Sequence, residues 1–131
     1  MFIRINPKST TPLYEQIIEQ VKEAIVKGIV EEGEKLPSVR DLASQIVLNP
    51  NTVSKAYKEL ERAGVIVTIR GKGTFVAEKE ERFDDPRERE VIKRQLKRLV
   101  IEASYVGVTK EKMVAWVEEE FRILEGNNHA D

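Results

Sequence analysis

The sequence of 131 residues predicts a mainly α-helical fold with one small β-hairpin. Apolar residues recur every three or four positions in five segments, a spacing that places them on one face of a helix. Near the middle of the chain, a β-branched run at residues 65–69 precedes a glycine-rich turn and a second short run at 74–76. With 40% hydrophobic and 34% charged residues, the composition is that of a soluble globular protein.

The N-terminal region predicts an arm or short strand over residues 1–9, followed by a helix. Thr11 is predicted to cap this helix, with Pro12 at its first helical position. The helix should end near Gly28, and residues 29–37 should form a polar connection. The apolar face of the helix contains Leu13, Ile17, Val21, Ala24 and Ile25.

The middle of the chain predicts two helices joined by a very short turn. Ser38 and Asp41 have the spacing of a capping box at the start of the first helix. Asn49 and Pro50 supply a cap and a first helical residue for the second helix, which should end at Gly64. The buried faces contain Val39, Leu42, Ala43 and Ile46 in the first helix, and Val53, Ala56, Tyr57 and Leu60 in the second. Two helices joined so closely define a helix-turn-helix.

The predicted hairpin follows this pair directly and is therefore a wing. Gly71 and Gly73 supply the backbone freedom that a tight turn needs, and Arg70 and Lys72 flank Gly71. Two cations thus project from a thin loop at a point where the backbone can approach a phosphate closely. We predict a winged helix-turn-helix domain over residues 1–77.

The remainder of the chain predicts a charged linker at residues 78–85 and a two-helix region at 86–131. Gly107 separates the two helices, and Thr109 is predicted to cap the second. Two amphipathic helices alone make a thin core, so we expect their apolar faces to pack against a second copy of the chain. The predicted dimerisation residues are Ile92, Leu96, Leu99, Ala103, Met113, Trp116, Val117, Phe121 and Leu124.

The distribution of charge favours a nucleic-acid partner more than the net charge of −1 does. Residues 49–73 carry five basic and two acidic side chains, so positive charge is concentrated on the predicted second helix and wing. The polar residues on or beside the outward face of that helix are Asn51, Thr52, Ser54, Lys55 and Lys58. Arg40, early in the preceding helix, can reach a DNA backbone or form a surface ion pair.

Other functions find little support in the residues. The chain has no cysteine and one histidine, so we expect no metal site and no cofactor, and the lack of cysteine fits a cytoplasmic protein. The run that begins at Gly71 lacks the upstream glycine of a phosphate-binding loop, and no serine–histidine pair indicates a hydrolase. No apolar run is long enough to cross a membrane. We expect the protein not to be an enzyme.

The first 77 residues resemble the GntR family of transcriptional regulators, and the short C-terminal region resembles its YtrA-type subfamily. The matching residues are Pro12-Leu13-Tyr14, Leu36-Pro37-Ser38-Val39-Arg40-Asp41-Leu42-Ala43, Asn49-Pro50-Asn51-Thr52-Val53, Ala56-Tyr57, Leu60-Glu61, Gly64 and Arg70-Gly71-Lys72-Gly73-Thr74-Phe75-Val76. The resemblance implies phosphate contacts from Arg40, Thr52 and Ser54. It also implies base-edge or phosphate contacts from residues 49–51, and groove contacts from Arg70, Gly71 and Lys72.

One position departs from the family pattern. Val47 stands in the turn where the family usually has glycine, and a β-branched residue is poorly suited to positive φ. We therefore expect either a different turn geometry or a slightly redirected tip of the second helix.

These observations predict a repressor that binds an inverted-repeat operator in double-stranded DNA as a homodimer. Two alternatives remain at this point. The winged helix can serve protein–protein contact, with its basic wing facing an acidic partner. Alternatively, a small-molecule effector can bind between the C-terminal helices, where Tyr105, Trp116 and Phe121 can line an apolar pocket.

Overall fold

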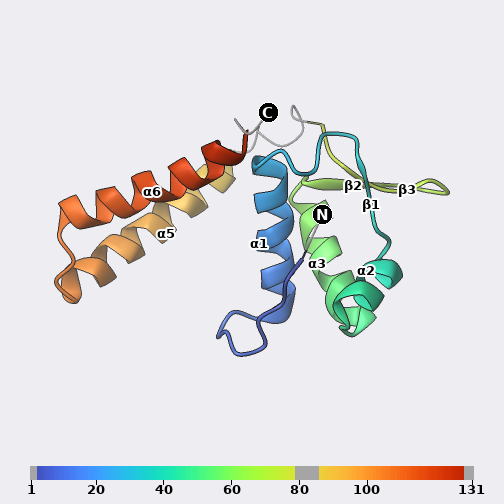
Figure 1. The fold of residues 1–131 in the computed structure, drawn as a ribbon, viewed down its shortest axis with the longest axis horizontal. Helices are drawn as coiled ribbons and strands as arrows, with labels where there is room; N and C mark the ends of the chain where they lie inside the picture. The colour runs from blue at the N-terminus through green and yellow to red at the C-terminus, as the bar shows by residue number, and fades with distance from the viewer. Residues whose placement is uncertain (1–2, 79–85, 129–131) are drawn as a thin grey trace. The chain divides into compact units, whose positions relative to one another are not determined.

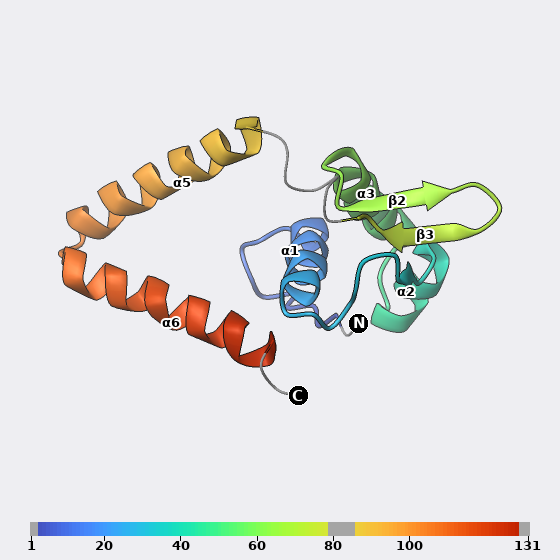
Figure 2. The ribbon, with the colours of Figure 1, turned by 90° about the horizontal axis from the view of Figure 1, so that it is seen from above.

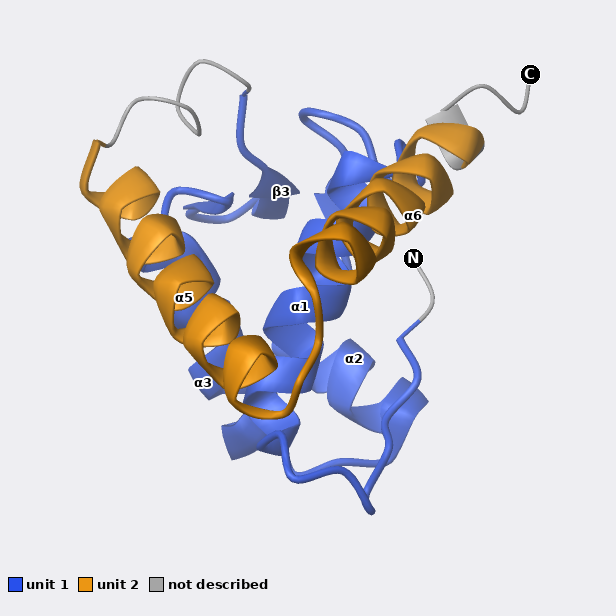
Figure 3. Ribbon diagram, turned by 90° about the vertical axis from the view of Figure 1, so that its left-hand side faces the viewer, with its two compact units in different colours: residues 1–83 blue, residues 84–131 orange. Residues whose placement is uncertain are grey.

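The computed structural model describes residues 3–78 and 86–128, which form five α-helices and one three-stranded antiparallel sheet. The elements are α1 (Leu13–Val26), β1 (Lys35–Leu36), α2 (Val39–Ile46), α3 (Pro50–Arg62), β2 (Ile66–Ile69), β3 (Gly73–Val76), α5 (Pro86–Tyr105) and α6 (Lys110–Asn128). The chain divides into two compact units, Met1–Phe83 and Asp84–Asp131, which Figure 3 distinguishes by colour. The predicted mainly helical fold with a small β-hairpin is confirmed.

The core of the first unit lies where α1, α2 and the sheet meet α3 (Figure 1). Ile17, Leu42 and Leu60 are at most 1% exposed, so all three helices supply core residues. Burying one such side chain stabilises the fold by about 1.5–3 kcal/mol. The helix-turn-helix is therefore held by its own packed core.

The predicted caps of the helix-turn-helix are confirmed, and the predicted cap of α1 is wrong. The Asp41 N–H donates to Ser38 Oγ (3.0 Å), and the Asn51 N–H donates to Asn49 Oδ1 (2.8 Å). At α1, by contrast, Pro12 is the N-cap and no side chain caps the helix. The Thr11 carbonyl instead accepts a hydrogen bond from the side chain of Gln16 (2.9 Å).

The segment predicted as a polar connection also contains strand β1, which the sequence did not indicate. β1 pairs with β3, which lies in the middle of the sheet between β1 and β2. Lys35 pairs with Phe75 and Leu36 with Thr74. A strand of two residues has no periodicity to detect, and its partner lies about forty positions away, so local patterns do not indicate it.

Residues 3–6 form an arm without a strand and lead into a turn at residues 7–9, and two glutamine side chains of α1 hold the arm. Gln16 accepts from the Asn6 N–H (2.9 Å) and donates to the Asn6 carbonyl (3.0 Å). Gln20 makes the same two bonds with Arg4, at 2.8 and 2.6 Å. These amides satisfy the backbone groups that a neighbouring strand would otherwise satisfy, and Ile3 is buried.

In the second unit, α5 and α6 diverge from their connection (Figures 2 and 3). The connection contains Gly107 at φ 81°, and Thr109 caps α6 by accepting from the Lys112 N–H (3.1 Å), as predicted. None of the described side chains of α5 and α6 is buried. The predicted linker, apart from Glu78, lies outside the described residues. No helix within the described ranges is long and apolar enough to cross a membrane.

Candidate nucleic-acid interface

The start of α3 presents short polar side chains to solvent. Val53, Ala56 and Leu60 are completely buried, so the opposite face of the helix points toward solvent. Asn51 is exposed, and Thr52 and Ser54 are half-buried beside it. The N-terminus of α3 also carries the positive end of the helix dipole, which favours a phosphate.

The cap limits what Asn49 can recognise. Its side-chain oxygen already accepts the Asn51 N–H. The remaining hydrogen-bonding capacity of the side chain is mainly that of its NH2 group, which is a donor. Asn49 can therefore approach an acceptor, such as a phosphate oxygen or a base carbonyl, whereas Asn51 retains both a donor and an acceptor.

The turn before α3 retains a left-handed conformation despite its valine. Val47 has φ 54° and ψ 53°, and among the described residues it alone combines a side chain with positive φ. The Leu48 N–H closes the turn on the Ala43 carbonyl (3.0 Å). A left-handed non-glycine residue costs about 1–2 kcal/mol. Val47 thus adopts a positive φ, which favours glycine, so the β-branched side chain does not force the turn out of the left-handed region.

Arg40 lies close to this turn. It is exposed on α2, and no ion pair involves it in the described part of the chain. A shallow surface hollow brings Arg40 together with the turn and the first residue of α3; it is lined by Arg40, Ala43, Ser44, Val47, Leu48 and Pro50. The first helix of the motif and the start of the second therefore border one depression in the surface.

The wing projects beyond the helices of the first unit (Figures 1 and 2). Its last paired residues are Ile69 and Gly73, and the Lys72 N–H donates to the Ile69 carbonyl (2.9 Å). Arg70, Gly71 and Lys72 form the exposed tip. Gly71 has φ 81°, a conformation that favours glycine. Both cations thus stand on a thin, hydrogen-bonded loop.

The side chains of two lysines make contacts that the sequence does not indicate. Lys55, one of the predicted DNA contacts, places its Nζ 4.0 Å from the ring centre of Tyr14 on α1, a cation–π distance. Lys35 on β1 extends along the wing, and its Cε lies 2.8 Å from the point where a Cβ on Gly73 would be. Both contacts join segments that are distant in sequence, so no local pattern indicates them.

Tyr57 ties α3 to the segment that leads into α2. Its hydroxyl group donates to the Pro37 carbonyl (2.6 Å). Burial raises the pKa of this hydroxyl to about 12, so it is neutral at ordinary pH. This bond holds α3 against the segment that precedes α2.

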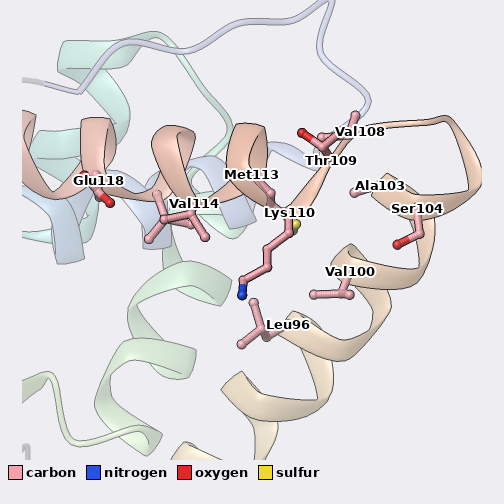
Figure 4. Close-up of a pocket in the computed structure, with 11 residues that line it drawn as sticks. Leu96, Val100, Ala103, Ser104, Val108, Thr109, Lys110, Met113, Val114 and Glu118 are labelled. Carbon is pink, nitrogen blue, oxygen red and sulfur yellow. The ribbon is translucent and has the colours of Figure 1, made fainter.

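An apolar groove lies between α5 and α6 of the second unit (Figure 4). It has a volume of about 370 Å³ and includes four of the nine predicted dimerisation residues: Leu96, Ala103, Met113 and Val117. Four others lie on the same helices with at least half of the side chain exposed: Ile92, Leu99, Trp116 and Phe121. Leu124 is half-buried. The side chain of Lys110 points into the groove (Figure 4).

Among the described residues, no group of histidine, aspartate and glutamate side chains can hold a metal ion. The arrangement instead offers exposed cations, amides and hydroxyl groups around a helix start. These groups bind phosphates and the edges of bases.

Comparison with known proteins identifies relatives along the chain. The family model described as "Bacterial regulatory proteins, gntR family" matches residues 13–76. The HTH-type transcriptional repressor YtrA of Bacillus subtilis (strain 168) is 51% identical over 129 residues, which cover 98% of this chain and 99% of the relative.

Solved structures give the same result. The crystal structure of a transcriptional antiterminator from Listeria monocytogenes EGD-e matches with a TM-score of 0.90 and 44% identity, covering 95% of this chain and 92% of that one. A crystal structure of AraR(DBD) in complex with operator ORR3 matches 56% of this chain and 89% of that one, with a TM-score of 0.50 and 28% identity. The similarity thus includes a protein crystallised on its operator.

Proposed function

The chain belongs to the gntR family of bacterial regulatory proteins and is a DNA-binding transcriptional regulator; from this premise we propose that it is a repressor that binds an inverted-repeat operator as a homodimer. The observation that carries the proposal is the exposed, capped start of α3 beside Arg40 and the turn. A regulator that acts on bacterial DNA works in the cytoplasm, and we place the protein there. No feature of the described residues requires a catalytic role.

The proposed contacts divide into those that hold the DNA backbone and those that read bases. Arg40, Thr52, Ser54, Arg70, Gly71 and Lys72 bind phosphates or line a groove. Asn51 reads a base edge, because an amide that keeps both donor and acceptor can form a paired contact with adenine. Asn49 contributes mainly donors, because its oxygen already accepts one hydrogen bond in capping α3. Lys55 already makes a cation–π contact with the ring of Tyr14, so we rank it below the other cations.

The second unit supports the homodimer. Exposed large apolar residues follow one another along both helices, and such a surface is costly to leave in water. A second copy offers the same two apolar helices, so two open hairpins can cover each other and form a four-helix core. A two-fold dimer presents its two α3 helices to half-sites about 34 Å apart, or a multiple of that distance, which predicts an inverted repeat.

The groove also bears on the alternative of a small-molecule effector. Its lining is apolar apart from a few groups that include Lys110 and Glu118. Tyr105, Trp116 and Phe121, from which the sequence predicted an effector pocket, are not among the lining residues. We assign the groove to the second copy, because the exposed apolar residues extend well beyond it along both helices. A metabolite that raises the melting temperature and also changes operator affinity would favour the effector instead.

A binding competition tests the proposed function. A duplex enriched from a random pool should bind at least about 10³-fold more tightly than a scrambled duplex of the same composition at about 0.15 M salt. Equal affinity for the two duplexes would contradict sequence-specific recognition. Failure to bind either duplex would favour a winged helix used for protein–protein contact.

Two substitutions separate the proposed roles. Lys72→Met should reduce the slope of log affinity against log salt by about 0.9 for each lost phosphate contact, equally for both duplexes. Asn51→Ala should reduce the preference for the enriched duplex by about 5- to 150-fold, corresponding to about 1–3 kcal/mol per base contact. Lys22→Met, on the exposed face of α1, is the matched control and should change neither quantity. An unchanged slope for Lys72→Met would remove Lys72 from the phosphate contacts.

A further inference from the structure

We propose that Lys35, on β1, is a third cation of the wing and binds a DNA phosphate next to the site of Lys72. The inference rests on the proposed DNA binding and adds a residue from outside the helix-turn-helix and the hairpin. It follows from the register of the sheet, the contact with Gly73 and the lack of an ion pair at Lys35 among the described residues.

The sheet register places Lys35 on the same face as Gly73. Lys35 is paired with Phe75, and side chains of paired residues point to the same face of a sheet. Gly73 lies two positions before Phe75, so it belongs to that face as well. Gly73 is also paired with Ile69, and only the three tip residues, 70–72, lie beyond this pair. A side chain that leans from Lys35 over Gly73 therefore points toward the tip of the wing.

The contact with Gly73 shows that Lys35 does lean this way. A Cβ on Gly73 would lie 2.8 Å from Lys35 Cε, 3.8 Å from Cδ and 3.5 Å from Nζ. The aliphatic stem thus occupies the space that any larger residue at this position would fill. Gly73 consequently has two roles: it adopts φ 127°, which favours glycine, and it leaves a path for the lysine.

No carboxylate forms an ion pair with the ammonium group within the described part of the chain. Lys35 is exposed and takes part in none of the ion pairs found there. The nearest carboxylate in sequence, Glu34, accepts a hydrogen bond from the Glu31 N–H (3.1 Å). The positive charge of Lys35 is therefore available to a ligand and adds to the charges of Arg70 and Lys72.

The arrangement suits an anion more than a base edge. A lysine ammonium is a compact charge without directional preference, so it binds a phosphate while tolerating small errors in position. Its stem is already packed against the wing backbone, so less side-chain freedom is lost when the phosphate arrives. We therefore assign to Lys35 a contribution to affinity that is independent of sequence.

The salt dependence of binding tests this assignment. Lys35→Met keeps an unbranched stem that can pack on Gly73 but removes the charge, and Lys35→Arg keeps the charge. With the enriched duplex, Lys35→Met should reduce the slope of log affinity against log salt by about 0.9 per protomer, and Lys35→Arg should restore it. The ratio of affinities for enriched and scrambled duplexes should stay unchanged in both variants. Lys22→Met is the control for loss of one exposed lysine.

The outcomes separate this inference from the proposed function. If the wild type binds the enriched duplex and Lys35→Met has the same slope as Lys22→Met, the Lys35 inference is wrong and the proposed function stands. If Lys35→Met changes the preference between duplexes and leaves the slope unaltered, Lys35 acts on bases and the phosphate assignment is also wrong. If the wild type binds no duplex, the proposed function fails, and the inference fails with it. Melting temperatures of the variants check that the stem still packs.

Discussion

The two units of the chain differ in the burial of their apolar residues. In the first unit, side chains such as Ile17, Leu42 and Leu60 are at most 1% exposed, and three helices and a sheet share one core. In the second unit, none of the described side chains of the two helices is buried, and the apolar residues of α5 and α6 line an open groove or face solvent. Apolar residues recur at helical spacing in both units. The units differ in how many helices and strands pack against one another.

This difference indicates what stabilises each unit. A helix becomes stable in water when its apolar face packs against another element. The first unit contains those elements itself. The second unit has two helices and needs another molecule to cover them, which we propose to be a second copy. Stability of the first unit should therefore be independent of protein concentration, and that of the second unit should depend on it.

Leu60→Ala should produce the largest effect and confine it to the first unit. The side chain is completely buried, and removing three carbon atoms from such a site costs about 4 kcal/mol through lost burial and the cavity left behind. Denaturant unfolding followed by far-ultraviolet circular dichroism measures the loss. The dimer should persist in a sedimentation experiment under native conditions. Dissociation caused by this variant would show that the two units are not independent.

Val117→Glu should act on the second unit alone. Val117 lines the groove, and burying an unpaired carboxylate there should weaken dimerisation by about 3 kcal/mol, more than 100-fold. Sedimentation over a range of concentrations measures the shift. Lys112→Glu, on an exposed position of α6 outside the groove, is the matched control. If Val117→Glu dimerises as strongly as the control, the groove is not the dimer interface.

Tyr57→Phe should destabilise the first unit by about 1 kcal/mol at neutral pH, because it removes the hydrogen bond to the Pro37 carbonyl. The pKa of Tyr57 is raised from 10.0 to about 12 in the folded protein. The resulting stabilisation is complete below pH 10 and is lost as the pH rises through about 12. The unfolding free energies of the two proteins should therefore converge above pH 10 and then cross before pH 12, because a shift of this size corresponds to about 2–3 kcal/mol, more than the hydrogen bond contributes. A constant difference up to pH 12 would contradict the assigned cause.

Val47→Gly should have the smallest effect, and it should stabilise the first unit. Glycine relieves about 1–2 kcal/mol of left-handed strain and loses about 0.4–1 kcal/mol through the greater freedom of the unfolded chain, which leaves a gain of about 0.5–1 kcal/mol. Val47→Ala keeps a side chain at positive φ and should gain less. Chemical denaturation compares the three proteins. A glycine variant less stable than the wild type would show that the exposed valine contributes contacts that offset its strain.

Most local features of the fold could be predicted from the sequence, the cap of α1 being an exception, and non-local ones could not. The caps at Ser38 and Asn49, the hairpin and the connection at Gly107 depend on neighbours in the chain, and the structure confirms them. Strand β1 depends on a pairing with β3, and the arm on the side chains of Gln16 and Gln20, so both were beyond local patterns.

In the candidate site, too, local features could be predicted from the sequence and contacts between separate elements could not. The polar start of α3 and the basic tip of the wing are contiguous in sequence and could be predicted as candidates. The contact of Lys55 with Tyr14 and the path of Lys35 over Gly73 arise from packing between separate elements. The conformation of Val47 lies between these cases: the sequence indicates a strained turn, and the structure shows that the left-handed geometry is retained.

The sequence recovered by the intact protein from a random duplex pool tests the central claim most directly. A first unit that reads DNA and a second unit that pairs two copies predict two inverted half-sites with centres about 10 base pairs apart, or a multiple of that spacing. A single half-site without a repeat would contradict the proposed pairing through α5 and α6. A pool without any enriched sequence would contradict the assignment of the α3 tip as the element that reads bases.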